Sequence, residues 1–126
     1  MTLYQSRQST TLVNNTTKHV YLQVPKGKIW RVHHVMMNNG DDVNRTMSIT
    51  IVDKNNNVLH PSTLISNATP SSNYNLLPNL DTQTYNLGFN YLIIKGENKL
   101  KLSWNAGGES SGGTAYYCVT YEEVPE

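Results

Sequence analysis

Strict alternation of apolar and polar side chains is the feature that most constrains the fold of this chain. It runs through residues 19–24, 45–53, 99–104 and 115–124. In the second of these segments, Met47, Ile49 and Ile51 fall on one side, and Thr46, Ser48 and Thr50 fall on the other. Because successive side chains of a β-strand point to opposite faces, each segment is predicted to be a strand with one face in water. No segment of useful length has the spacing of an amphipathic helix, so the pattern predicts an all-β, antiparallel fold.

Turn-forming residues separate the alternating segments. They occupy residues 25–27, 38–42, 54–57, 96–98 and 107–113. Asn, Asp and Gly tolerate positive φ, and Asn and Asp also hydrogen-bond to their own backbone, which favours turns at these places. The spacing of the turns predicts about eight strands, arranged as an antiparallel, jelly-roll-like β-sandwich.

The middle of the chain lacks this regular pattern. Residues 61–86 contain scattered apolar side chains, three prolines and many Ser, Thr and Asn residues. We expect long connections there, with short strands near residues 64–65 and 74–77.

The N-terminus is also irregular, because residues 1–8 carry little core material. They are predicted to form an extended arm of a kind that can become ordered against a neighbouring protein. The predicted division is therefore an arm with a first short strand over residues 1–17, followed by a single β-sandwich domain over residues 18–126.

Composition and charge argue against several classes of partner. Ten basic and nine acidic side chains give a net charge of +1 without a basic patch, so nucleic acid is not expected as a partner. No apolar stretch approaches the length of a membrane span, and the first residues lack the apolar region of a signal peptide, so we expect a soluble protein without membrane contact. Cys118 is the only cysteine, which excludes an intrachain disulfide, and its apolar surroundings predict a buried side chain.

The histidines do not have the spacing of a metal site. His33 and His34 are neighbours on a predicted strand, so their side chains are expected to point to opposite faces. His19 and His60 are isolated, and no cysteine or acidic residue is spaced to assist them. We therefore expect neither a metal nor any other cofactor.

The residues that could suggest catalysis lack the surroundings that catalysis requires. G-x-S-x-G occurs once, at residues 108–112, but no helical pattern follows it, and its serines lie in a stretch too rich in glycine to hold a nucleophile in place. The adjacent acids Asp41–Asp42 and Glu122–Glu123 are expected to be solvated rather than held across a cleft. The sequence thus predicts a protein that is not an enzyme.

Aromatic side chains leave two alternatives open. Trp104 falls on the same strand face as Leu100 and Leu102 and is predicted to lie in the core. Tyr21, Tyr91 and Tyr116 fall on outward faces, where tyrosine either contacts another subunit or stacks on a sugar ring. Subunit contact and carbohydrate binding are both retained as hypotheses.

The strand expected at residues 29–37 has partly apolar side chains on both faces. Strict alternation assigns Trp30, Val32, His34 and Met36 to one face, and Arg31, His33, Val35 and Met37 to the other. A strand with this composition is expected to be covered on both sides, by its own core and by a neighbouring subunit.

Several segments together resemble a known group of proteins. VPKGKIWRVHHVMM, TMSITIVDKNNNVL and YLIIKGENKLKLSW are followed by a Gly/Ser loop and a final Tyr-rich strand. This order resembles the small β-sandwich proteins of tailed-phage virions, in which elements similar to V-P-x-G-K-x-W-R-V and L-x-x-G-x-x-L-x-L recur. The resemblance covers about residues 18–124, and it rests on strand and turn patterns.

The resemblance implies a structural role in a virion. Such proteins decorate capsids or form the bases of head fibres and tail appendages, commonly as jelly-roll trimers. We therefore expect a non-enzymatic auxiliary or decoration capsid protein, made in the host cytoplasm and located in the virion. Its expected partners are copies of itself, as a homotrimer, and the major capsid protein or other virion proteins. The alternative is a carbohydrate- or receptor-binding module of a phage tail or fibre, with a glycan as ligand.

The predicted contact residues come from the arm and from outward strand positions. They are Thr2, Leu3, Tyr4, Arg7, Arg31, His33 and Tyr116.

Overall fold

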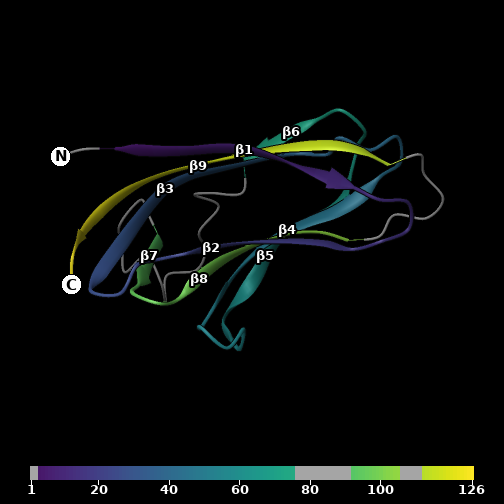
Figure 1. Cartoon of the computed structure of the whole chain (residues 1–126). Coiled ribbons are helices and arrows are strands. Elements are labelled where there is room, and N and C mark those ends of the chain that lie inside the picture. Colours follow the sequence, from purple (N-terminus) through teal and green to yellow (C-terminus); the bar gives the residue numbers. More distant parts are fainter. Residues whose placement is uncertain (1–2, 76–91, 106–111) are drawn as a thin grey trace.

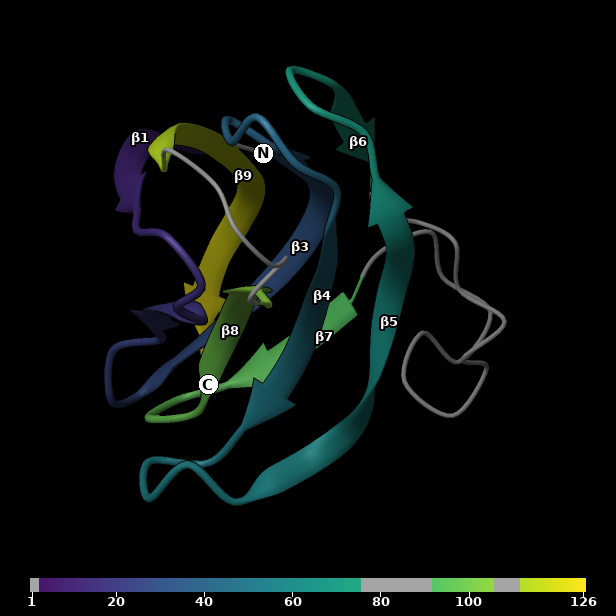
Figure 2. The same cartoon turned by 90° about the vertical axis from the view of Figure 1, so that its right-hand side faces the viewer.

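A computed structural model describes residues 3–75, 92–105 and 112–126, and every regular element in these ranges is a β-strand (Figure 1). The strands are β1 (Tyr4–Leu12), β2 (Lys18–Gln23), β3 (Lys28–Asn38), β4 (Arg45–Val52), β5 (Val58–Ala68), β6 (Asn73–Asn75), β7 (Leu92–Lys95), β8 (Lys99–Trp104) and β9 (Gly113–Pro125). They form two antiparallel sheets that face each other as two layers (Figure 2). The prediction of an all-β, antiparallel sandwich is confirmed.

The strand order is that of a jelly roll. The five-stranded sheet has the order β1-β9-β3-β6, with β7 also paired to β3, and the four-stranded sheet has the order β2-β8-β4-β5. Since β6 pairs with one end of β3 and β7 with the other, these two short strands share a single position in the sheet. With that position counted once, the described strands follow the order of a double-sheet jelly roll.

Alternation predicted the buried faces of most strands correctly. Met47, Ile49 and Ile51 of β4 are buried in the core. They pair across the sheet with the buried residues Trp104, Leu102 and Leu100 of β8. These side chains face the opposite sheet. Removing their apolar surface from water is the main contribution that stabilises the fold.

Strand β3 departs from strict alternation at a β-bulge. The register with β9 shifts between Val32 and His34, which leaves His33 as the additional residue. Beyond the bulge the buried residues are Val35 and Met37. The prediction that His34 and Met36 share a face with Trp30 and Val32 was wrong, because one extra residue in a strand exchanges the faces of all residues that follow it.

The first half of the irregular middle forms a longer strand than expected. β5 runs for eleven residues, Val58–Ala68, and includes the short strand predicted at residues 64–65. It also contains Pro61, which is compatible with this strand because β5 lies at a sheet edge and needs no donor on its free side. Of the strand predicted at residues 74–77, β6 covers residues 74–75, and the remainder lies outside the described residues.

The segment predicted as an arm belongs to the sandwich. It is extended, as expected, but from Tyr4 to Leu12 it pairs residue by residue with β9. The division at residue 17 therefore does not separate an arm from the domain. Sequence patterning predicted only a short first strand within residues 1–17, because the side chains of β1 are mostly polar and exposed, and only Leu12 is buried.

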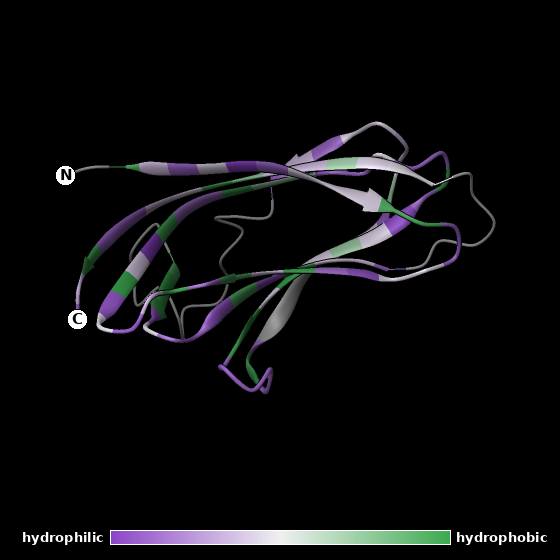
Figure 3. Ribbon diagram, in the orientation of Figure 1, coloured by the Kyte–Doolittle hydropathy of each residue, from purple (hydrophilic) through white to green (hydrophobic). Residues whose placement is uncertain are grey.

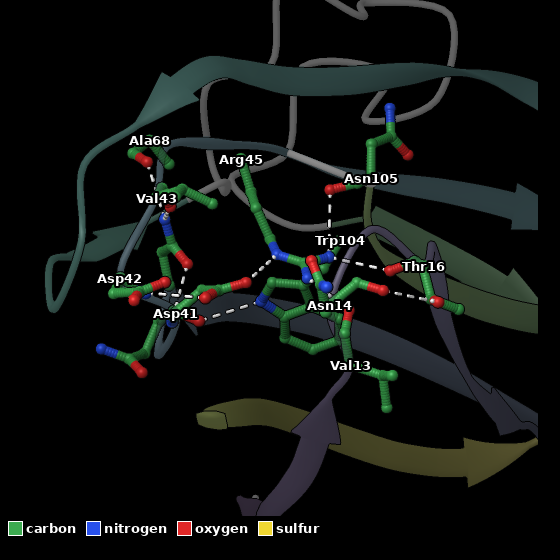
Figure 4. Close-up of polar contacts among 12 residues, drawn as sticks. Val13, Asn14, Thr16, Asp41, Asp42, Val43, Arg45, Ala68, Trp104 and Asn105 are labelled. Carbon is green, nitrogen blue, oxygen red and sulfur yellow. Dashed lines mark hydrogen bonds and ion pairs between the residues drawn. The ribbon is translucent and has the colours of Figure 1, made fainter. Parts of the chain in front are cut away.

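One end of the sandwich is closed by a buried ion pair (Figure 4). The guanidinium group of Arg45 donates through Nε to Asp41 Oδ2 at 2.7 Å, and the side chains of both residues are fully buried. Its Nη1 donates to the carbonyl oxygens of Thr16 at 2.9 Å and Asn105 at 3.2 Å, and its Nη2 donates to that of Val13 at 2.9 Å. Arg45 thereby joins the β1–β2 connection, the β3–β4 connection and the end of β8.

A second set of buried hydrogen bonds supports the same end. Asn39 Nδ2 donates to the carbonyl oxygens of Val43 at 3.0 Å and Ala68 at 2.7 Å. Trp104 Nε1 donates to the carbonyl oxygen of Asn38 at 2.9 Å. Each of these buried polar groups has a hydrogen-bond partner, which offsets the free-energy cost of removing the group from water. The hydrogen bonds therefore hold the connections in place.

Candidate interface on the outer face of the five-stranded sheet

The outer face of the five-stranded sheet brings together contact residues predicted from distant parts of the sequence. Arg7 of β1 lies opposite Cys118 of β9, and Cys118 lies opposite Met36 of β3. Residues directly opposite in a sheet share a face, and so do residues two apart on one strand, which places Tyr116 on this face too. We call this surface the outer face. It is formed by Arg7, Met36 and Tyr116, and farther along β3 and β9 by Arg31, His33 and Glu122.

An open hollow of about 280 Å³ lies on the outer face. It is lined by Arg7 of β1, Met36 of β3, Asn73 of β6 and Tyr116 of β9. Tyr116 is 55 % exposed, which is high for so large an aromatic side chain. The hollow thus combines a guanidinium group, a thioether, an amide and a phenol at a place that is open to a partner.

A charged group lies farther along the same face. Glu122 is buried although it faces outward, and its Oε1 lies 2.6 Å from His33 Nε2. Arg31 lies directly opposite Glu122 in the sheet, with Nη1 3.8 Å from Glu122 Oε2. The side chain of Arg31 is 42 % exposed, whereas that of Glu122 is 8 % exposed. The acidic member is therefore covered, and the basic members form the accessible surface.

The bulge explains why both histidines reach the outer face. His34 pairs with Thr120, whose neighbour Val119 is buried and points inward. His33, the extra residue, contacts the outward-facing Glu122. The prediction that the two histidines point to opposite faces was therefore wrong. Within residues 3–75, 92–105 and 112–126, no three His, Cys, Asp or Glu side chains are placed to hold a metal ion.

Two of the predicted contact residues lie elsewhere. Tyr4 is opposite Tyr121 and stacks on it, with ring centroids 5.7 Å apart, and Tyr121 stacks on Trp30 at 4.0 Å. Burial raises the pKa of the Tyr121 hydroxyl, and Glu123 and Tyr4 raise it further. Tyr4, at the start of β1, and Leu3, just before it, are exposed, and neither lines the hollow. Thr2 and Tyr91 lie outside the described residues.

Sequence reasoning missed three members of the surface. Glu122 was interpreted as solvated, although alternation already placed it on the same strand face as Tyr116. Met36 was placed on the face of Trp30 and Val32, which the structure shows to be the core face, because the bulge has no signal in the sequence. Asn73 lies in the irregular middle, where nothing indicated which strand it would approach.

The four-stranded sheet carries a different exposed cluster. Tyr21 of β2 is exposed, and the ammonium groups of Lys99 and Lys101 of β8 lie 5.3 Å and 6.0 Å from its ring centroid. The ring of His19 lies 6.3 Å from that of Tyr21, and its Nδ1 is 2.8 Å from Ser103 Oγ. Burial lowers the pKa of His19, and the charge of Lys101 lowers it further. This cluster presents an aromatic ring with positive charge around it.

Both tryptophans are buried, so neither belongs to an exposed sugar-stacking surface. The core position predicted for Trp104 is confirmed.

No helix long and apolar enough to cross a membrane occurs among the residues that the structure describes. A scan against models of protein families found no matching family, and a search of curated proteins found no matching sequence.

Proposed function

We propose that this chain is a non-enzymatic structural protein of a phage-like virion. In this role it is an auxiliary or decoration protein that associates with copies of itself and docks on the capsid surface. The observation that carries the proposal is the outer face, where Arg7, Arg31, His33 and Tyr116 gather from three strands. Two further lines support it, namely the resemblance of the strand and turn pattern to virion proteins and a jelly-roll order that viral capsid domains also use. Because a fold alone does not define function, the proposal rests mainly on the outer face.

The chemistry of the outer face suits a protein partner. Tyr, Met and Arg are enriched in protein interfaces, where they combine apolar contact area with hydrogen bonding. Tyr116 and Met36 provide this area around the hollow, and Arg7 provides donors at its border. Because Glu122 is covered and lies against His33 and Arg31, the face presents little negative charge, which favours an acidic or neutral partner surface.

The first experiment determines whether the chain is a virion component. Particles produced from a genome that encodes it are purified and analysed by quantitative mass spectrometry. The proposal expects the chain at a fixed copy ratio to the major capsid protein, and light scattering of the purified chain is expected to show an oligomer. A monomer at high concentration that is absent from the particles contradicts the proposal.

The second experiment locates the docking face. Particles that lack the chain are mixed with purified protein, and binding is measured by cosedimentation. Replacing both Arg7 and Tyr116 by Ala is expected to weaken binding at least about tenfold, since both side chains lie at the hollow. The matched control is Tyr21→Ala, which removes an exposed tyrosine from the opposite sheet and is expected to leave binding unchanged.

The Tyr21 cluster favours a second candidate function, the binding of an acidic glycan. An exposed aromatic ring can stack on a sugar, and Lys99 and Lys101 are placed to meet a carboxylate or sulfate group beside it. Binding to sialylated or sulfated sugars on a glycan array, lost in Tyr21→Ala and kept in Tyr116→Ala, supports this candidate. An array without signal for acidic glycans contradicts it.

A further inference from the structure

The exposed sheet edges of the sandwich differ in how well they are protected against pairing with another chain. Proteins commonly protect an edge with a bulge, a proline, a lysine or a short strand. β5 contains Pro61 and shifts register with β4 at three places. β2 has six residues and begins with Lys18, while β6 and β7 have three and four residues. Each of these edges therefore has at least one protective feature.

The edge formed by β1 has almost none of these features. Its nine residues, YQSRQSTTL, pair with β9 without a register shift, and they include neither proline nor lysine. Arg7 is its single charge. In the described part of the chain no strand pairs with the other side of β1, which forms the outer border of its layer (Figure 2). A flat, regular edge of this length is a template for a further strand.

The distribution of hydrophobic residues along β1 indicates which strand fits. The middle of the strand is hydrophilic, and hydrophobic residues lie at both of its ends (Figure 3). Leu3 and Tyr4 at the start are 50 % and 47 % exposed, and Val13, just after the end, is 54 % exposed. This arrangement is nearly the same when the strand is read in the opposite direction, as an antiparallel pairing of identical strands requires.

We propose that β1 pairs antiparallel with β1 of a second copy of this chain, across a two-fold axis at Gln8. In this register Leu3 lies opposite Val13 of the other copy, and Tyr4 lies opposite Leu12. Arg7 lies opposite Ser9, so the two arginines do not face each other. The exposed side chains of Leu3 and Val13 then cover each other, Tyr4 lies against the strand end at the buried Leu12, and the free backbone groups of the edge are used.

The neighbouring symmetric registers fit less well. An axis at Arg7 places the two Arg7 side chains directly opposite each other, which is unfavourable for like charges. An axis at Ser9 places Leu3 opposite Asn15 and Tyr4 opposite Asn14, so the apolar pairs are lost. The register centred on Gln8 is thus selected by charge and by apolar contact together.

This contact is independent of the proposed virion role and leaves most of the outer face accessible. It joins two five-stranded sheets into one continuous sheet and gives an even number of copies. If a separate three-fold contact exists, the assembly has six copies, and otherwise it has two.

Opposite charges introduced at position 9 test the register. Ser9→Arg places a new positive charge opposite Arg7 twice in each dimer, and we expect the dimer dissociation constant to rise about tenfold. Ser9→Glu forms two ion pairs with Arg7 at the same place, and we expect the constant to fall below that of the wild type. Sedimentation equilibrium of the full chain measures both, and raising the salt concentration is expected to reduce the difference between the two variants.

Gln5→Arg and Gln5→Glu are the matched controls, because Gln5 faces the uncharged Thr11 in the proposed register. These two variants are expected to dimerise with similar constants. Thermal unfolding of every variant establishes that the exposed substitutions leave the fold intact. A folded wild-type chain that stays monomeric at high concentration overturns the proposal, and so does a dimer that responds equally to Arg and Glu at position 9.

Discussion

Two arginine–carboxylate pairs of this molecule differ in their surroundings, although they have the same chemistry. Arg45 and Asp41 are fully buried at one end of the sandwich, and Arg45 also donates to three backbone carbonyl groups. Arg31 and Glu122 lie on the outer face, with Nη1 and Oε2 3.8 Å apart, and the arginine side chain is partly accessible to solvent. The two pairs therefore have different consequences for stability and for recognition.

The difference follows from the dielectric surroundings. Breaking a buried pair by removing one partner leaves an uncompensated charge in the interior, whereas a solvent-exposed pair is screened by water and salt. The closed end is accordingly expected to determine whether the chain folds. The outer face is expected to tolerate substitution and to determine what the folded protein binds.

The largest expected effect comes from breaking the closed end. Arg45→Met leaves the buried carboxylate of Asp41 without its ionic partner, and the free energy of unfolding is expected to fall by about 3–5 kcal/mol. Thermal and denaturant unfolding measure this loss. The matched variant Arg31→Met on the outer face is expected to cost less than about 1 kcal/mol. Equal losses in the two variants would contradict the comparison.

Close packing at the same end predicts a second large effect. A Cβ atom at Gly40 would lie 1.8 Å from the carbonyl oxygen of Thr114, so Gly40→Ala requires the backbone to move. We expect a loss of about 1–3 kcal/mol in denaturant unfolding. Gly27→Asn is the control, because the space around Gly27 is open and Asn tolerates its positive φ of 79°. An unchanged free energy of unfolding in Gly40→Ala would contradict the close contact between the backbones at Gly40 and Thr114.

The bulge predicts that the outer face tolerates even the loss of a residue. Deleting one histidine of the His33–His34 pair leaves a strand in which Trp30, Val32, Val35 and Met37 alternate regularly and all still face the core. The loss of the contact with Glu122 is expected to cost about 1 kcal/mol in denaturant unfolding, with the fold retained. If β3 lacked the bulge, the same deletion would turn Val35 and Met37 outward, and the chain would not fold.

The smallest expected effect concerns the opposite sheet. Since burial and Lys101 both lower the pKa of His19, the folded state takes up a proton less readily than the unfolded chain does. The contribution of His19 to stability is therefore present above pH 6.5 and decreases as the pH falls through the lowered pKa. Lys101→Met is expected to move this pKa back towards its ordinary value, as measured by NMR titration of the ring. An unchanged His19 pKa in this variant would exclude Lys101 as a cause.

The fold class and most of the core could be predicted because alternation is a local property. Met47, Ile49 and Ile51 were placed correctly from the alternation within residues 45–53 alone. The full length of β1 and its place in the sheet were not foreseen, since β1 is held by backbone pairing with β9, more than 100 residues away, and its polar side chains give no signal.

The candidate site was predicted only in part, for a similar physical reason. Arg7, Arg31, His33 and Tyr116 were predicted as contact residues, but the sequence did not show that they share one surface. That depends on strand order and on the bulge at His33, which exchanges the faces of Met36 and Met37. The role of Arg45 was also not foreseen, because its carbonyl partners lie 29 to 60 residues away in the sequence.

Hydroxyl-radical footprinting of the free and the capsid-bound protein compares the two exposed sheet faces in one sample, and it therefore shows most directly which face docks on the capsid. We expect oxidation of Tyr116 and Met36 to fall on binding, while oxidation of Tyr21 on the opposite sheet stays unchanged. Tyr116 and Met36 oxidised equally in both states, with Tyr21 protected instead, would contradict the assignment of the outer face as the docking surface.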